Sequence, residues 1–397
     1  MVRGTRMLAL ACLWLAPLTI LYIALASDWV DTWKTFAVPS FRPPFMDLCA
    51  ITNGVKVHQQ GGDPLLDNPE DPFHRALPYP RIWVQLFSWL GIRESHTRIL
   101  GITFCVLYLI CISWLILKIE SSLGAILLMI AALSLAPLLA LERGNIDLFI
   151  FFLLFVGCNA TNRFLKSGIF LAATVLKVYP IAAQAVDAIR RPLKENRVAI
   201  TAVAVAAAVW IWKWRELGAI RRAAPVSTTL AFGMLSLKLQ AEYVNGALLA
   251  ISLVACAVIL AMAWMARPSL DGVIRNSRFG EMFLVFAGTY AFTFAVGSNY
   301  NYRLILLIPT LPLACELVRS IEHRKWGIIY IASVLVAENS VALGMYQGIP
   351  LEDLATFTLF AMILPIVLEQ AREFLLDAAT LFQPSANVAV SHDKVAG

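Results

Sequence analysis

Hydrophobic residues occur along this chain in long runs separated by short polar segments. Each run has roughly 15 to 22 residues, close to the number that an α-helix needs to cross the hydrocarbon core of a membrane. The pattern therefore predicts an all-α, polytopic membrane protein with about ten full spans. The expected spans are residues 7–26, 97–117, 122–140, 146–160, 197–213, 244–265, 280–297, 304–319, 326–343 and 353–370.

The segment at residues 168–189 differs, because Lys177 and Pro180 lie in its middle and basic residues lie at both ends. Two shorter helices with a break between them fit this pattern better than one span. The total then becomes about twelve spans, an even number that places both termini on the same side of the membrane.

Composition strengthens the membrane assignment. Hydrophobic residues make up 59% of the chain and charged residues 15%, whereas soluble domains carry about 25% charged residues. The net charge of +6 is spread over short loops, which argues against nucleic-acid binding. The seven cysteines form no Cys-x-x-Cys pair, and only Cys49 is expected in an aqueous loop, so no disulfide framework is implied.

Lysine and arginine are concentrated in alternate loops, which sets the orientation. If Arg3 and Arg6 are cytoplasmic, most other loop cations are as well. The first apolar run is expected to remain as a spanning helix, with Trp29 and Trp33 as interfacial anchors. Residues 1–382 are then one transmembrane domain, and residues 383–397 have the composition of a mobile, polar cytoplasmic tail.

The same orientation places a second set of polar segments on the extracytoplasmic face. One of them, Glu142-Arg143-Gly144-Asn145-Ile146-Asp147, interrupts an otherwise apolar stretch; its simplest interpretation is a solvated turn. A charged side chain at the centre of a spanning helix costs roughly 2.5–3.5 kcal/mol, so polar groups near lipid usually face a cavity or a ligand. The segments on this face are residues 27–98, 142–147, 177–180, 214–245 and 298–303.

The first loop, residues 27–98, contains clusters of Pro, Gly, Asp and Asn that specify turns, which predicts an ordered loop. Residues 82–92 are apolar but too short to span. We expect them to form an interfacial helix with Trp83 and Trp89 as anchors.

The order of several short motifs resembles a known family. An Asp after the first span (Asp47) is followed by Gly-Gly-Asp63-Pro, Tyr79-Pro, Arg143-Gly-Asn145 and Lys177-x-x-Pro180. This order resembles the polyprenol-phosphate-dependent membrane mannosyltransferases of glycosyltransferase family 87, in the GT-C superfamily. The resemblance covers residues 7–197, and the second half matches mainly in helix pattern and in the Tyr300-Asn-Tyr302-Arg303 turn. The chain departs from the family at Arg81, where a second Pro is usual, and at Leu65, where a Tyr is frequent.

The resemblance implies a GT-C bundle that transfers a sugar, mannose above all, from a polyprenyl-phosphate donor with inversion. Such a reaction needs one carboxylate to accept the proton of the acceptor hydroxyl. Asp47 matches the family's catalytic Asp, although it could also be a turn or cap residue. Asp63 is the competing carboxylate, and Asp before Pro is also a common turn former. Asp67, Glu70 and Asp71 are expected to form a solvated acidic surface, with binding of a cation as the alternative. No spacing in the loop predicts a metal or other cofactor.

The leaving phosphate requires cations, and an Arg fork suits its oxygens. The candidates are Arg143, Lys177 and Arg303. Arg303 could instead be an interfacial Arg that reaches toward water, and Arg143 could equally pair with Glu142 or Asp147. Weaker candidates are Arg81, Arg221 and Arg222.

Sugar or acceptor contacts are expected from polar and aromatic residues on the same face. Asn145 could instead cap the following helix, and interfacial belts account equally well for the aromatic residues. The candidates are Asp63, Asn145, Asp147, Tyr79, Tyr300 and Tyr302, with Trp212 and Trp214 as further aromatic residues.

The expected partners are a polyprenyl-phosphate sugar, a glycolipid or polysaccharide acceptor and membrane lipids, at the inner membrane of a bacterial cell. Two other functions remain open. A lipid or lipid-linked-sugar transporter would use the same cations without chemistry, but would be expected to show a path of polar groups and paired repeats. A relative that has lost catalysis could act as a membrane scaffold.

Overall fold

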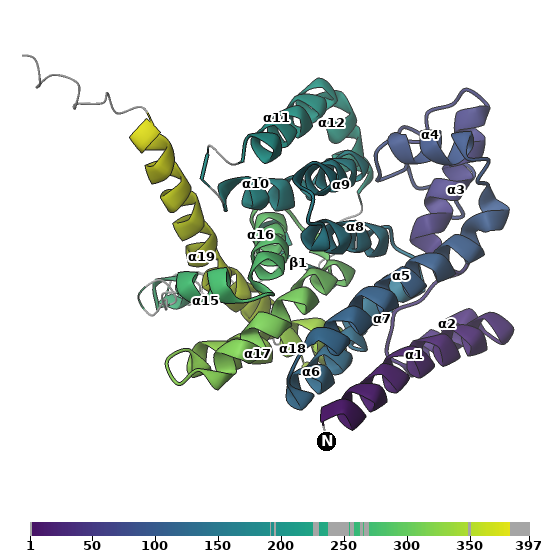
Figure 1. Cartoon of the computed structure of the whole chain (residues 1–397). Helices are drawn as coiled ribbons and strands as arrows, with labels where there is room; N and C mark the ends of the chain where they lie inside the picture. The colour runs from purple at the N-terminus through teal and green to yellow at the C-terminus, as the bar shows by residue number, and fades with distance from the viewer. Residues whose placement is uncertain are drawn as a thin grey trace, which may run out of the picture.

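The computed structural model describes residues 2–190, 192, 193, 196–224, 230–236, 254, 258–262, 265, 270–347 and 351–381. In this part of the chain the fold is almost entirely helical (Figure 1). A single antiparallel pairing joins β1 (Ala231–Phe232) to β2 (Asn299–Tyr300). The expected tail at residues 383–397 lies outside the described residues.

The helices follow the apolar runs along the sequence. In the first half they are α1 (Val2–Ala26), α2 (Trp29–Thr35), α3 (Met46–Gln59), α4 (Ile82–Trp89), η1 (Glu94–His96), α5 (Thr97–Lys118), α6 (Ser122–Ala132), α7 (Leu135–Arg143), α8 (Asp147–Asn159), α9 (Arg163–Leu176) and α10 (Ile181–Ile189). In the second half they are α11 (Arg197–Trp212), α12 (Trp214–Ala223), α15 (Asp271–Asn276), α16 (Gly280–Val296), η2 (Asn301–Thr310), α17 (Leu311–Arg319), α18 (Arg324–Gln347) and α19 (Leu351–Leu381).

Four described helical segments are long and apolar enough to cross a membrane, or up to six if each bent pair counts as one span. These segments identify an integral membrane protein. One bent pair is α6 with α7, which meet at 47°, so the run at residues 122–140 is not the single helix that the sequence predicted. The helices α8 and α16, with 13 and 17 residues, are shorter than the roughly 20 residues of a full span. Most of the run at residues 244–265 lies outside the described residues.

The predicted break in the segment at residues 168–189 is confirmed. Helix α9 ends at Leu176 and α10 begins at Ile181, with Lys177 and Pro180 between them. The hydroxyl of Thr174 in α9 donates to Oε1 of Gln184 in α10 at 3.4 Å, so the two helices pack together. The backbone groups freed at such a break require polar surroundings inside a membrane protein.

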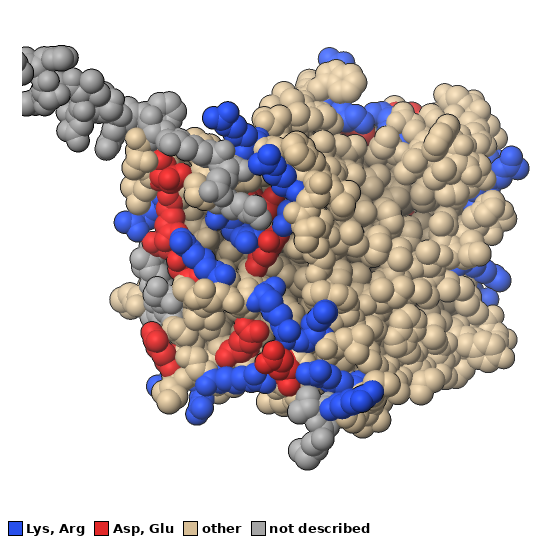
Figure 2. All heavy atoms as spheres, in the orientation of Figure 1, with Lys and Arg blue, Asp and Glu red and all other residues tan. Residues whose placement is uncertain are grey.

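Charged side chains gather toward one end of the molecule, and a broad uncharged area adjoins them (Figure 2). Arg278 donates to the carbonyl oxygen of Lys118, and Arg275 pairs with Glu373 at 2.6 Å. These contacts bring together segments that the distribution of Lys and Arg predicted on one side of the membrane. An uncharged band next to a charged end is the surface expected of a chain that spans a bilayer.

Three tryptophans expected as interfacial anchors are instead packed inside the protein. Trp29, Trp33 and Trp83 are buried, and Nε1 of Trp83 donates to the carbonyl oxygen of Leu176 at 2.8 Å. Only Trp89 of this set is exposed. Cys49 is also buried rather than in an aqueous loop. The segment between α1 and α5 is therefore packed against the helical bundle through its aromatic residues.

Candidate functional site

A cavity of about 660 Å³ lies where the polar segments predicted on one face come together. Its lining comes from the first loop, α7, the break between α9 and α10, the end of α12 and the turn at residues 298–303. Seven of the predicted site residues line it: Asp47, Tyr79, Arg143, Lys177, Tyr300, Tyr302 and Arg303. Segments that are far apart in the sequence thus contribute to one site.

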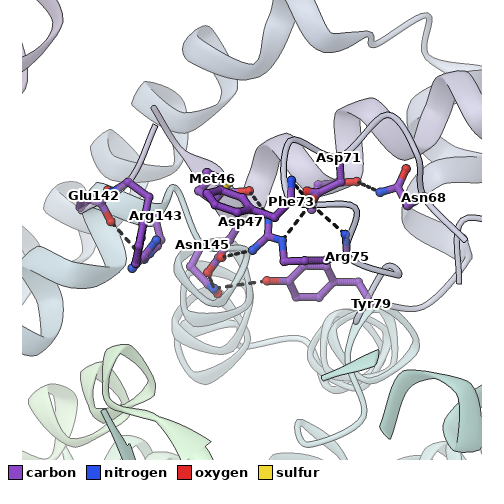
Figure 3. A network of polar contacts seen from close by, with 12 residues as sticks. Met46, Asp47, Asn68, Asp71, Phe73, Arg75, Tyr79, Glu142, Arg143 and Asn145 are labelled. Atoms are coloured by element: carbon purple, nitrogen blue, oxygen red, sulfur yellow. Dashed lines mark hydrogen bonds and ion pairs between the residues drawn. The ribbon is translucent and has the colours of Figure 1, made fainter. Parts of the chain in front are cut away.

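Asp47 stands in the first turn of α3 and faces this cavity with a side chain that is 16% exposed. Its Oδ2 accepts a hydrogen bond of 2.6 Å from Nδ2 of Asn145, and its Oδ1 lies 3.9 Å from Nη1 of Arg75. Figure 3 shows Asp47, Asn145, Arg75 and Tyr79 gathered at this point. The carboxylate is held by neighbours and still reaches the open volume.

Phe45 and Gly144 explain how α3 and α7 approach each other here. Gly144 ends α7 with φ +55°, and a Cβ at this position would lie 2.8 Å from the Phe45 side chain. Phe45 is fully buried and packs edge-to-face on Trp29 with ring centroids 5.0 Å apart. Glycine is therefore needed both for the left-handed turn and for the close packing. This contact places Asn145 next to Asp47.

Asn145 contacts the start of the following helix, one of the two roles that the sequence left open, and also binds Asp47. Its Oδ1 accepts the backbone N–H of Asp147 at 2.8 Å, at the start of α8, while its Nδ2 binds Asp47. Asn145 is fully buried and lies behind the cavity. It acts as a positioning residue for the Asp47 carboxylate.

Asp147 lies between two predicted phosphate ligands. Its Oδ1 lies 2.6 Å from Nζ of Lys177, and its Oδ2 accepts from Nε of Arg303 at 3.2 Å. The hydroxyl of Tyr179 also donates to Oδ1, at 2.8 Å. Asp147 is fully buried, whereas Lys177 and Arg303 line the cavity. Two cations share one carboxylate, so this group of three side chains presents a net positive charge to the cavity.

Arg143 has a different electrostatic environment. Its Nε pairs with Oε2 of Glu142 at 3.1 Å, which decides between the two partners that the sequence allowed. The other oxygen, Oε1, accepts from Nε1 of Trp29 at 3.0 Å and from the hydroxyl of Ser40 at 2.8 Å. Glu142 is fully buried. The interpretation of residues 142–147 as a solvated turn is therefore wrong, and Arg143 is neutralised by its own partner (Figure 3).

Arg75 lines the cavity but was not among the residues predicted from sequence. It binds Asp71 with Nε at 3.0 Å and Nη2 at 2.9 Å, and Nη2 also donates to the carbonyl oxygen of Met46. Asp71 is buried, so the expectation that it forms part of a solvated acidic surface is wrong. Burial tends to raise the pKa of Asp71, but hydrogen bonds from Arg75 hold that pKa below its usual value. The available sequence signal was that Arg75 is the single Lys or Arg at residues 61–80.

The other two acidic residues of that group are at the surface. Asp67 is exposed, and Glu70 forms an ion pair of 2.8 Å with Lys56. Neither residue lines the cavity.

Asp63, the competing carboxylate, has structural partners outside the cavity. It pairs with Arg81 at 2.5 Å and accepts the backbone N–H of Leu65. The hydrogen bond from Arg81 lowers the pKa of Asp63. Arg81 also lies 3.6 Å from Glu216, which ties the first loop to α12. Arg81, where the chain departs from the motif that it resembles, thus joins the first loop to α12.

Of the predicted aromatic contacts, Tyr300 and Tyr302 line the cavity as a stacked pair with ring centroids 5.5 Å apart. Tyr79 lines it as well, and Nζ of Lys177 lies 5.2 Å from its ring centroid. Trp212, Trp214, Arg221 and Arg222 are exposed and do not line the cavity. Within the described ranges, no three His, Cys, Asp or Glu side chains are grouped as a metal site.

Comparisons with known proteins returned no relatives. No family model matches the sequence, no curated protein matches it, and no solved structure matches its fold. The functional interpretation therefore rests on the geometry of the cavity and on the motifs in the sequence.

Proposed function

We propose that this protein is an integral-membrane glycosyltransferase that uses a polyprenyl-phosphate sugar, with mannose as the first candidate. The proposed topology has about twelve spans, with both termini cytoplasmic and the cavity on the extracytoplasmic face of a bacterial inner membrane. The observation that carries the proposal is the arrangement of Asp47 and the Lys177–Arg303 pair around one cavity.

The charges match the needs of an inverting transfer. Asp47 would take the proton of the acceptor hydroxyl while the oxygen of that hydroxyl bonds to C1 of the sugar. The bond from C1 to the phosphate oxygen breaks, and its electron pair stays on the polyprenyl phosphate. Lys177 and Arg303, with one carboxylate between them, would offset the charge that develops on this leaving group.

The rest of the lining suits a lipid-linked donor. Apolar side chains from α7, α12 and α16 line the cavity together with the cations, including Leu139, Ile220, Phe292 and Val296. An isoprenoid chain could be buried against these residues, because removal of apolar surface from water is favourable. A site that only bound a phosphate lipid would gain nothing from Asp47, whose negative charge repels the phosphate.

The test is transfer by purified protein in detergent, with a panel of polyprenyl-phosphate hexoses that includes mannose. Asp47→Asn should lower kcat by about 10²- to 10⁴-fold, the range typical of a lost general base. Asp63→Asn is the matched control, because it removes a carboxylate of the same loop that lies outside the cavity. Its effect on kcat should be small.

Melting temperatures of both variants show whether folding is retained. Full activity of Asp47→Asn would remove the assigned base. If the wild-type protein formed no product in detergent but moved labelled lipid across reconstituted vesicles, it would be a transporter instead.

A further inference from the structure

Two exposed phenylalanines line the same cavity as the Asp47 carboxylate. Phe41 is 47% exposed and Phe73 is 51% exposed, and both belong to the first loop. Their rings meet edge-to-face with centroids 6.1 Å apart at 81°. Exposed aromatic faces are costly in water, so a pair of them in a cavity indicates a surface that a ligand covers.

An arginine packs on each of these rings. Cζ of Arg143 lies 4.6 Å from the Phe41 centroid, and Cζ of Arg75 lies 5.6 Å from the Phe73 centroid. Each guanidinium is also bound to a buried carboxylate, Glu142 or Asp71, so its position is fixed and its charge is balanced. The four side chains form one preorganised surface, which we name the Phe41–Phe73 platform.

The chemistry of this platform fits a sugar ring. One face of a pyranose carries C–H groups that pack on the electron-rich face of an aromatic ring. The hydroxyls at its rim need hydrogen-bond donors, which guanidinium groups supply. A purely hydrocarbon ligand would gain nothing from the two arginines.

The platform is also electrostatically distinct from the donor side of the cavity. The excess positive charge resides at Lys177 and Arg303, which share Asp147. Arg143 is paired with Glu142, whereas Arg75 is paired with Asp71 and also lies 3.9 Å from Asp47, so neither arginine carries excess positive charge. A phosphate therefore gains more at the first group, and a neutral sugar is accommodated better at the second.

The geometry points to an acceptor site: we propose that the acceptor is a carbohydrate whose terminal sugar stacks on Phe41 and Phe73 and presents a hydroxyl to Asp47. This inference rests on the proposed function. It assigns Arg143 to the acceptor rather than to the donor phosphate, and it gives Arg75 the matching role on the second ring.

The experiment measures two reactions of the full-length protein in detergent. One is release of polyprenyl phosphate from the donor with water as the acceptor. The other is transfer to octyl mannoside, octyl glucoside or octyl galactoside, with octanol as a chain-matched acceptor that lacks a sugar. The variants are Phe41→Leu and Phe73→Leu, with Phe41→Tyr and Phe73→Tyr to keep the ring. Trp89→Leu is the control for loss of an exposed aromatic residue outside the cavity.

Each leucine variant should raise KM for the preferred octyl glycoside by roughly three- to tenfold, the range typical of one lost aromatic contact. The acceptor KM should rise more than the donor KM in these variants, and the tyrosine variants should restore the acceptor KM. Trp89→Leu should leave both KM values and the hydrolysis rate at the wild-type value. The proposed carbohydrate site would be overturned by any of three results. These are equal use of octanol and the octyl glycosides, no transfer to any octyl glycoside, or an unchanged acceptor KM in both leucine variants. Absence of any donor turnover in the wild-type protein would instead overturn the proposed function.

Discussion

Asp147 and Glu281, two carboxylates in the described part of the chain, each form a group with two cations. In the first, Asp147 lies between Lys177 and Arg303 and adjoins the cavity of about 660 Å³. In the second, Glu281 binds Lys166 and lies 2.5 Å from Arg190, near a void of only about 20 Å³. The charges are alike, but only the first group has room for a ligand.

The comparison shows that a buried charge pattern does not by itself identify a functional site. Ion pairs between side chains of different helices can have a purely structural role, because each buried charge needs a partner. The open volume, and the presence of Asp47 on its wall, distinguish the first group from the second. Variants of both groups can test this distinction.

The largest effect is expected when the central carboxylate of the first group is removed. Asp147→Asn leaves two buried cations without their partner, and loss of one member of a buried pair costs about 3–5 kcal/mol. Glu281→Gln should cost less, because the Glu281 side chain is 19% exposed and water can replace part of the interaction. Thermal unfolding in detergent measures both. Equal destabilisation would mean that the two groups are equivalent in burial.

The next effect concerns activity. Lys177→Met or Arg303→Met should lower kcat/KM for the donor by about 10²-fold, the range found when one charge-stabilising donor is lost. Lys166→Met removes the corresponding cation of the second group and should change only the melting temperature. Initial rates at varied donor concentration distinguish the two outcomes. A similar loss of kcat/KM in Lys166→Met would contradict the functional difference between the groups.

A smaller effect is expected from the ion pair of Asp71 with Arg75, one of the arginines of the Phe41–Phe73 platform. The pKa of Asp71 is lowered in the folded state, so its stabilising contribution is present above the unfolded pKa of about 3.9 and is lost as the pH falls through the folded value. Hydrogen bonds to charged groups contribute about 1.5–3 kcal/mol. Asp71→Asn should lower the melting temperature at pH 7 and show a weaker further decrease between pH 5 and pH 3 than the wild type. Parallel pH curves would refute the assignment.

The smallest effect is expected from exposed ion pairs outside both groups. Arg275 is 63% exposed and binds Asp271 and Glu373. Exposed ion pairs contribute about 0–1 kcal/mol, so Arg275→Met should leave the melting temperature nearly unchanged. A decrease as large as that of Glu281→Gln would show that exposure does not govern these contributions.

The sequence by itself determined that the chain is a helical membrane protein and where most helices lie, because apolar runs and charged loops are local properties. It also predicted the break at Lys177, since Pro180 and a mid-segment charge disfavour one continuous helix. The distribution of Lys and Arg further indicated which polar segments share a face. Arg143, Lys177 and Arg303 could be selected for that reason, whereas Asp47 was selected from the resemblance to the family's motif order.

Only the tertiary structure decided the partners of these residues. Arg303 meets Asp147 across 156 positions of sequence, and Glu142 meets Trp29 across 113. Such contacts depend on which helices pack together, and neither hydropathy nor turn motifs encode that choice locally. For the same reason Arg75 was missed, Asp71 was expected in solvent, and buried tryptophans were expected at the membrane interface. Hydropathy determines which segments enter the membrane, whereas packing between helices determines which charges meet.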